Sequence, residues 1–154
     1  MRIIPAAGND LETVLGITYT TINAVYPHYY PAGAVGFFIA HHSSENVLRD
    51  IKAGKVFLLY DDSGTAAGTV TVDAREINRL FVLPEYQGKG FGGELLRFAE
   101  ERIALMYSSA ELSASLPAKA IYLKKGYHIT EYHIIDTPDG DFLCYDLMEK
   151  KLRD

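Results

Sequence analysis

Hydrophobic and polar positions follow a helical period in the first third of the chain. Apolar residues recur at this spacing after Asn9 or Asp10, either of which can cap a helix, and again from Ser43 or Ser44 to Gly54. The intervening segment, PHYYPAGAVGFFIAHH, is aromatic and begins at a proline, so it predicts a loop and a short helix. A short strand over residues 2–6 precedes these helices.

The period then changes to that of strands. Residues 56–60, 67–73 and 76–82 are β-rich, with the turn signal DDSG and the dipeptide Ala74-Arg75 between them. A parallel crossover needs about a dozen residues or more, so these short connections predict an antiparallel meander.

The last part of the chain alternates between helices and strands. We expect a helix over 91–106, a strand over 111–115, a helix from Pro117 to Gly126, and a hairpin of 127–136 with 142–148. The predicted order is β-α-α-β-β-β-α-β-α-β-β. It describes an α/β fold (α+β, with a mixed sheet covered by helices) that forms a single domain over residues 1–154.

Composition and charge narrow the function. The formal net charge of −5 argues against a nucleic-acid partner, because phosphate binding needs a basic field. No apolar run approaches the roughly 18 residues of a membrane span, and the N-terminus lacks the features of a signal peptide. Cys144 is the single cysteine, which excludes an internal disulfide. We therefore expect a soluble, cytoplasmic protein with no membrane partner.

The stretch YQGKGFGGELL carries the clearest chemical signal. Four glycines fall between Gly88 and Gly93, directly where a helix begins. A helix N-terminus has unbonded amides and a partial positive charge, and glycine lets a ligand approach the backbone. The loop therefore favours an anion, with a pyrophosphate as the usual ligand.

Two common phosphate loops fit this stretch poorly. A P-loop needs Lys-Ser or Lys-Thr after its second glycine, which the chain lacks. Gly88, Gly90 and Gly93 spell the G-x-G-x-x-G of dinucleotide-binding proteins, and Glu111 lies near the distance expected for a ribose-binding acid. That motif follows its strand directly in a parallel sheet, whereas here residues 83–86 intervene and the preceding strands are predicted to be antiparallel.

The run EINRLFVLPEYQGKGFGGELL resembles the acetyl-CoA signature of the GNAT superfamily of N-acetyltransferases, which is a strand, V-x-P-x-[Y/W]-[Q/R]-G-x-G-x-G and a helix. Downstream, AKAIYLKKGY is similar to the family's A-x-x-x-Y-x-x-x-G-[F/Y] segment. In element order the resemblance covers essentially the whole chain. It implies direct transfer of the acetyl group of acetyl-CoA, as co-substrate, to a primary amine of a small molecule or peptide. It also allows a homodimer, since family members often pair.

The resemblance implies a coenzyme site at the end of the third meander strand. That strand parts from the next parallel strand, and Leu80, Phe81 and Val82 line the pantetheine arm, mostly through main-chain groups. Ser115 stands where the family often has an asparagine that bonds to the arm, so this contact is lost or bridged by water. The residues implied to wrap the pyrophosphate are Gln87, Gly88, Lys89, Gly90, Phe91, Gly92 and Gly93.

Two residues take the catalytic positions that the resemblance implies. Tyr122 stands four residues before Gly126, where the family places a tyrosine that acts as an acid toward the coenzyme A thiolate. The alternative is a tyrosine that packs on the helix and only touches the coenzyme. Glu76 begins the strand at a position where some members keep a carboxylate base that works through water; the alternative is a solvated charge. Asp73, His133 and a water chain are the other candidate bases.

Several other residues invite functional interpretations. Cys144 lies in a predicted strand and is expected to be a buried small hydrophobe. The histidines lack metal spacing, and adjacent His41 and His42 would face different sides of a helix, so we expect no metal. Three tyrosines follow the first helix, where the family places its acceptor-binding loop, and they either line a pocket or cover the sheet. They are Tyr26, Tyr29 and Tyr30.

Two other functions compete with the enzyme. The first is a non-catalytic sensor or accessory domain that binds acyl-CoA, and the second is a nucleotide-dependent oxidoreductase. Tyr122 and the intact glycine loop favour the acetyltransferase, and the predicted topology disfavours the oxidoreductase.

Overall fold

The computed structural model describes residues 1–154 and contains one seven-stranded mixed sheet flanked by helices, as the fold class predicted. The strand order is β1-β2-β3-β4-β5-β7-β6. The strands are β1 (Arg2–Pro5), β2 (Val56–Tyr60), β3 (Ala66–Asp73), β4 (Glu76–Val82), β5 (Ser109–Ala114), β6 (His128–Asp136) and β7 (Phe142–Lys151). The helices are α1 (Leu11–Val25), α2 (Ala32–His41), α3 (Ser44–Lys52), α4 (Phe91–Ala104) and α5 (Leu116–Lys124).

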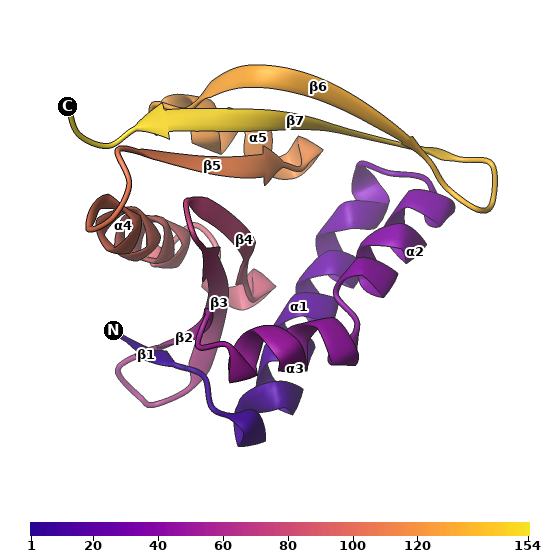
Figure 1. Ribbon diagram of the computed structural model, residues 1–154. Coiled ribbons are helices and arrows are strands. Elements are labelled where there is room, and N and C mark those ends of the chain that lie inside the picture. The colour runs from indigo at the N-terminus through magenta and orange to yellow at the C-terminus, as the bar shows by residue number, and fades with distance from the viewer.

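The sheet divides where its one parallel pair meets. β2, β3 and β4 form the predicted antiparallel meander, and β5, β7 and β6 pair antiparallel on the other side. β4 and β5 are parallel but pair only at Glu76 with Glu111 and at Ile77 with Leu112. Beyond Ile77 the two strands separate, and Figure 1 shows the β5–β7–β6 half running in a different direction from the meander.

Helices cover both faces of the meander and create two apolar clusters. α4 packs on one face, where its buried stripe of Leu95, Ala99 and Ile103 meets residues of β2 to β5. α1, α2 and α3 lie on the other face (Figure 1), and their apolar residues pack with Leu58 and Phe81. The site described below lies where these layers meet at the end of β4.

A β-bulge in β4 decides which face each of its side chains reaches. Thr69 pairs with Phe81 and Thr71 with Asn78, so β4 carries one extra residue between these pairs. Arg79 lies in this bulge with φ of 46°, in the left-handed region. Side chains four apart on a regular strand share a face. The extra residue instead places Ile77 in the α4 cluster and Phe81 in the cluster of α1 to α3.

The observed elements differ from the predicted ones in several places, of which three concern the site or the helix count. The aromatic segment forms α2, the short helix expected there, which the predicted order with two helices before β2 left out. β5 ends at Ala114, and Ser115 is the N-cap of α5 instead of the last strand residue. α4 ends at Ala104, two residues early. None of the helices combines the length and apolarity that a membrane crossing requires.

Candidate active site

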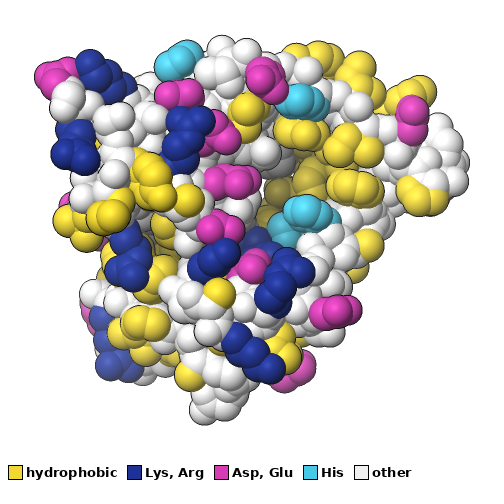
Figure 2. Space-filling model, viewed as in Figure 1, with side chains coloured by type: hydrophobic (Ala, Val, Ile, Leu, Met, Phe, Trp, Pro, Cys, Tyr) yellow, Lys and Arg dark blue, Asp and Glu magenta, His cyan; other side chains and the backbone are white.

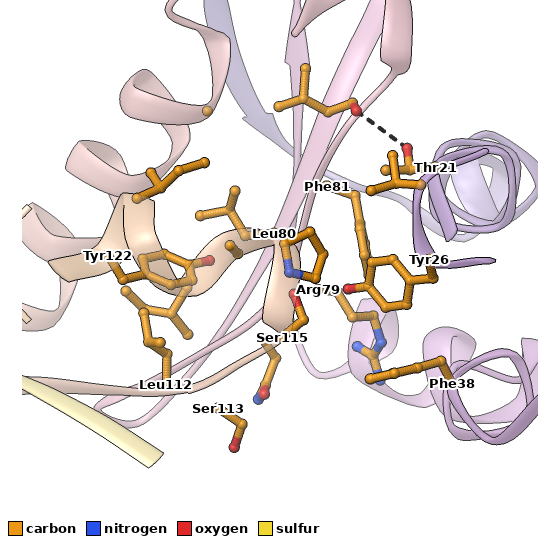
Figure 3. Close-up of a pocket in the computed structure, with 18 of the residues that line it drawn as sticks. Thr21, Tyr26, Phe38, Arg79, Leu80, Phe81, Leu112, Ser113, Ser115 and Tyr122 are labelled. Carbon is orange, nitrogen blue, oxygen red and sulfur yellow. Dashed lines mark hydrogen bonds between the residues drawn. The ribbon is translucent and has the colours of Figure 1, made fainter. Parts of the chain in front are cut away.

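A cavity of about 700 Å³ opens between the separating ends of β4 and β5. Figure 2 shows a hollow on this side of the molecule, with histidine and acidic side chains at its margin. Figure 3 shows its walls, with Tyr122 on one side and Tyr26, Phe38 and Arg79 on the other. The predicted site residues that line the cavity are Glu76, Leu80, Phe81, Val82, Gln87, Gly88, Gly90, Gly92, Gly93, Ser115 and Tyr122.

The glycine loop forms one end of the cavity. Gly88 and Gly90 have φ of 73° and 89°, a conformation that favours glycine, and Gly90 is the N-cap of α4. None of the six main-chain amides from Gly88 to Gly93 donates a hydrogen bond within the protein. These free amides lie at the positive end of the α4 dipole, so they suit a diphosphate.

Two residues of the loop offer the cavity only their backbone. The ammonium of Lys89 donates to the carbonyl oxygen of Glu85 at 2.7 Å. The ring of Phe91 is buried and packs edge-on against Tyr86, with 5.1 Å between ring centroids. Neither side chain lines the cavity, so a contact of Lys89 or Phe91 with a ligand there would come from its amide.

The loop is also tied to the end of β4. The side-chain amide of Gln87 donates to the carbonyl oxygen of Val82 at 2.9 Å, and the hydroxyl of Thr21 donates to the same oxygen at 3.3 Å. These bonds join the loop, β4 and α1 at one atom. The loop geometry is thereby coupled to the strand end where β4 has lost its β5 partner.

Tyr122 projects from α5 into the cavity. Its ring packs edge-on against Tyr127 at 5.7 Å between centroids, and its hydroxyl donates no hydrogen bond within the protein. Burial raises the pKa of Tyr122 above its usual value, with a smaller contribution from Tyr26. The phenol is therefore protonated at neutral pH and its proton is available to a ligand.

Glu76 lines the cavity at the start of β4, at the point where β4 and β5 still pair. Burial, followed by the neighbouring carboxylates of Glu111 and Asp73, raises the pKa of Glu76. Glu111 itself is bound by Arg75, with 2.6 Å between the guanidinium nitrogen and the carboxylate oxygen. Glu76 lacks such a partner, which makes it a stronger proton acceptor than an ordinary surface glutamate.

The other candidate bases lie outside the cavity. Asp73 is paired with Lys55 at 2.8 Å, and His133 contacts Glu131 at 2.8 Å on β6. Neither side chain is among the lining residues. Of the titratable side chains named from the sequence as bases, only Glu76 reaches the cavity.

The tyrosines after α1 take three different positions. Tyr26 is buried and lines the cavity, and burial raises its pKa despite hydrogen bonding to Ser115. Tyr30 is buried too, and its hydroxyl oxygen accepts the amide of Leu116 at 2.7 Å, at the start of α5. Tyr29 is 52% exposed. The segment thus both lines the cavity and holds the helix that carries Tyr122.

Sequence reasoning missed a polar cluster on the opposite wall. Arg79 extends from the β4 bulge, and its side chain is 7% exposed and pairs with Asp50 of α3 at 2.7 Å. His42 is buried beside it. The expectation that His41 and His42 face different sides is wrong, because α2 ends between them; both line the cavity, with ring centroids 5.0 Å apart. A bulged arginine in a strand pattern carries no local sequence signal.

Two further expectations concern Cys144 and the potential metal ligands. Cys144 is partly buried, whereas the sequence predicted a buried residue. No three or more His, Cys, Asp or Glu side chains come together as potential metal ligands.

Comparison with known proteins identifies the family. Residues 25–136 match the family model described as an acetyltransferase (GNAT) domain. No curated protein matches the chain.

Solved structures share the fold at low sequence identity. The GCN5-related N-acetyltransferase from Rhodopseudomonas palustris has a TM-score of 0.86 at 19% identity, over 97% of this chain and 94% of that one. The PaiA N-acetyltransferase from Thermoplasma acidophilum, solved with coenzyme A, has a TM-score of 0.71 at 24% identity, over 97% and 98%. A phosphinothricin acetyltransferase from Sinorhizobium meliloti, solved with acetyl-CoA, has a TM-score of 0.74 at 19% identity, over 99% and 88%.

The family match spans most of the chain, and the cavity, the free loop amides and the parted strands all lie within or beside it. The chain therefore belongs to the GNAT family of acetyltransferases and is an acyltransferase.

Proposed function

We propose that this enzyme transfers the acetyl group of acetyl-CoA directly to the primary amine of a small molecule or peptide. The observation that carries the proposal is one continuous cavity that joins the free amides of residues 88–93, the unpaired end of β4, Glu76 and Tyr122. The amides hold the diphosphate, and the backbone of Leu80 to Val82, which has no strand partner on the β5 side, pairs with the pantetheine arm.

The amine must lose a proton before it can attack. A lysine-like amine has a pKa of about 10.4 and is almost fully protonated at neutral pH. Glu76, with its raised pKa, accepts this proton directly or through water. The neutral nitrogen then forms a bond to the thioester carbon, and an amide near Val82 stabilises the oxyanion.

The carbon–sulfur bond then breaks, and coenzyme A leaves as a thiolate. Tyr122 donates its phenolic proton toward the sulfur. Because an ordinary thiol has a pKa of about 8.5, below that of a phenol, Tyr122 acts chiefly as a hydrogen-bond donor as the bond breaks. As the carbonyl re-forms, the nitrogen loses its second proton to solvent, and the products are the N-acetyl amine and the coenzyme A thiolate, which solvent protonates.

The choice between small-molecule and protein acceptors is open to experiment. The names of the structural neighbours include a ribosomal-protein-S18-alanine N-acetyltransferase from Escherichia coli and the phosphinothricin acetyltransferase, so both classes occur on this fold. The test is release of free thiol from acetyl-CoA with a panel of amino acids, alkyl and aryl amines, polyamines, aminoglycosides and peptides. Binding of coenzyme A without thiol release for any amine would refute transfer to an amine.

A further inference from the structure

The guanidinium of Arg79 makes three polar contacts but leaves one nitrogen free. Its Nε donates to Nδ1 of His42 at 3.1 Å, and Nη1 donates to the Thr71 hydroxyl at 3.2 Å and contacts Asp50 at 2.7 Å. Its Nη2 donates no hydrogen bond within the protein. No buried side-chain nitrogen or oxygen is without a partner, so Nη2 is accessible, and Arg79 lines the cavity.

The contact with Arg79 also orients His42. Nδ1 of His42 accepts a hydrogen bond, and burial followed by the charges of Arg79 and His41 lowers the pKa of His42 to about 3. The neutral ring therefore carries its proton on Nε2. Nε2 has no partner in the protein either, so this wall of the cavity offers two neighbouring donors, one on Arg79 and one on His42.

The local charge favours an anion. Asp50 pairs with Arg79 at 2.7 Å, and the largely exposed Arg49 approaches its other carboxylate oxygen at 3.7 Å. Among the lining residues Glu76 is the only acidic side chain, against the cations Arg79 and Lys125. A polycation would find a single carboxylate here, whereas an incoming carboxylate would meet an excess of positive charge.

The surroundings of the two donors are aromatic. The ring of His42 packs edge-on against Phe81 at 5.7 Å, and Tyr26 packs edge-on against Phe38 at 4.7 Å. In Figure 3, Arg79 lies on the side of the cavity with Tyr26 and Phe38, across from Tyr122. A compact polar group set in apolar walls recognises one charged substituent on an otherwise apolar molecule.

The backbone strain at Arg79 also indicates that this residue has a functional role at the cavity wall. A non-glycine residue in the left-handed region is strained, and such strain concentrates at functional sites. Here the bulge holds the guanidinium at the cavity wall.

From this arrangement we propose that Arg79 and His42 form a carboxylate subsite, so that the acceptor is a primary amine carrying a carboxylate, such as an α-amino acid with an apolar side chain. The inference rests on the proposed acetyl transfer to an amine, which brings the nitrogen of the acceptor toward Glu76 while its carboxylate binds Arg79.

Matched acceptors test the subsite. The rates of thiol release are compared for L-phenylalanine, L-phenylalaninamide and 2-phenylethylamine, and for L-leucine and 3-methylbutylamine. We expect a higher kcat/KM for the two acids than for the compounds that lack the carboxylate. In Arg79→Gln the ratio of acid to amine should fall roughly tenfold to hundredfold, the range for one charged hydrogen bond.

Two further variants separate recognition from folding. His42→Asn keeps an acceptor for Nε of Arg79 but removes the Nε2 donor, and should lower the ratio roughly threefold to tenfold. Arg49→Gln removes an exposed charge near Asp50 that does not line the cavity, and should change the ratio less than about fivefold.

The outcomes distinguish the inference from the proposed function. Two results would overturn the carboxylate subsite while leaving acetyl transfer intact. One is an equal kcat/KM for acid and amine acceptors in the wild-type enzyme. The other is that Arg79→Gln and His42→Asn lower kcat/KM for acid acceptors by the same factor as for amine acceptors. If coenzyme A binds but no amine of either kind releases thiol, the proposed function fails and the subsite falls with it.

Discussion

At the scale of single residues, the proposed chemistry depends on two side chains that line the cavity, Tyr122 and Glu76. Tyr122 keeps its proton because burial raises its pKa. Glu76 is the only lining carboxylate, and its raised pKa lies closer to that of a working base. One group is suited to give a proton and the other to take one.

Replacing Tyr122 with phenylalanine should preserve the fold and lower kcat by tenfold or more, because only the hydroxyl is lost and it makes no bond within the protein. The matched control is Tyr127→Phe, which removes a hydroxyl bonded to Glu100 at 2.9 Å outside the cavity. The control should cost about 1 kcal/mol of stability and leave turnover near the wild-type value. Steady-state kinetics of both variants decide the point; wild-type turnover in Tyr122→Phe would remove this residue from the mechanism.

Replacing Glu76 with glutamine should lower kcat/KM and remove the acidic limb of its pH profile, because the base must be deprotonated to act. The same variant should be less active but more stable than the wild-type protein at neutral pH. Between the unfolded pKa, about 4.3, and the raised folded pKa, the folded state holds more protons, so stability falls as pH rises. Glutamine does not titrate, so the variant does not lose stability in this way and should melt at a higher temperature than the wild-type protein at neutral pH. An unchanged pH–rate profile would exclude Glu76 as the base.

At the scale of elements, the loop before α4 and the parting of β4 from β5 create the site together. The glycines free six consecutive amides, and the strand end leaves backbone groups without a partner. The glycine loop alone would only connect a strand to a helix, and the parted strand end alone would only be a sheet edge.

The loop conformation is tested by Gly90→Ala. Alanine at φ of 89° costs about 1–2 kcal/mol, so the loop should shift and weaken coenzyme A binding roughly tenfold by calorimetry. Gly16→Ala is the matched control, since Gly16 lies exposed within α1 with open space for a methyl group. That control should stabilise the protein by about 1 kcal/mol and leave affinity unchanged. Wild-type affinity in Gly90→Ala would show that this backbone geometry does not govern binding.

At the scale of the whole molecule, only two residue pairs of β4 and β5 join the two halves of the sheet as a ladder, and helices from both faces reach the gap. A ligand that spans the gap binds the folded state alone. Coenzyme A at 100 times its Kd should therefore stabilise the protein by about 2.7 kcal/mol.

For a chain of 154 residues this corresponds to a rise in Tm of roughly 5–10 °C, measured by calorimetry or circular dichroism. The Gly90→Ala variant, at the same coenzyme concentration, should show a smaller rise. An absence of any shift with the wild-type protein would contradict binding in the gap.

The order of most elements, the antiparallel meander and the glycine loop could be predicted from the amino-acid sequence, because these features follow from local periodicity and from the backbone freedom of glycine. The resemblance of its motifs placed Glu76 and Tyr122, and both line the cavity. The aromatic segment was harder to interpret, since its apolar residues have no polar face to set a helical period, and it forms α2.

The bulge at Arg79 and the cluster that Arg79 forms with Asp50 and His42 arise from tertiary packing and could not be predicted from the sequence. These residues come from β4, α3 and the end of α2, and no periodicity links them. A bulge depends on the pairing of one strand with another, and the partner of a buried charge depends on which helix packs over it. Local sequence therefore supplied the groups proposed for acyl transfer, whereas the packing of α2 and α3 on the sheet shaped the wall that we propose binds the acceptor.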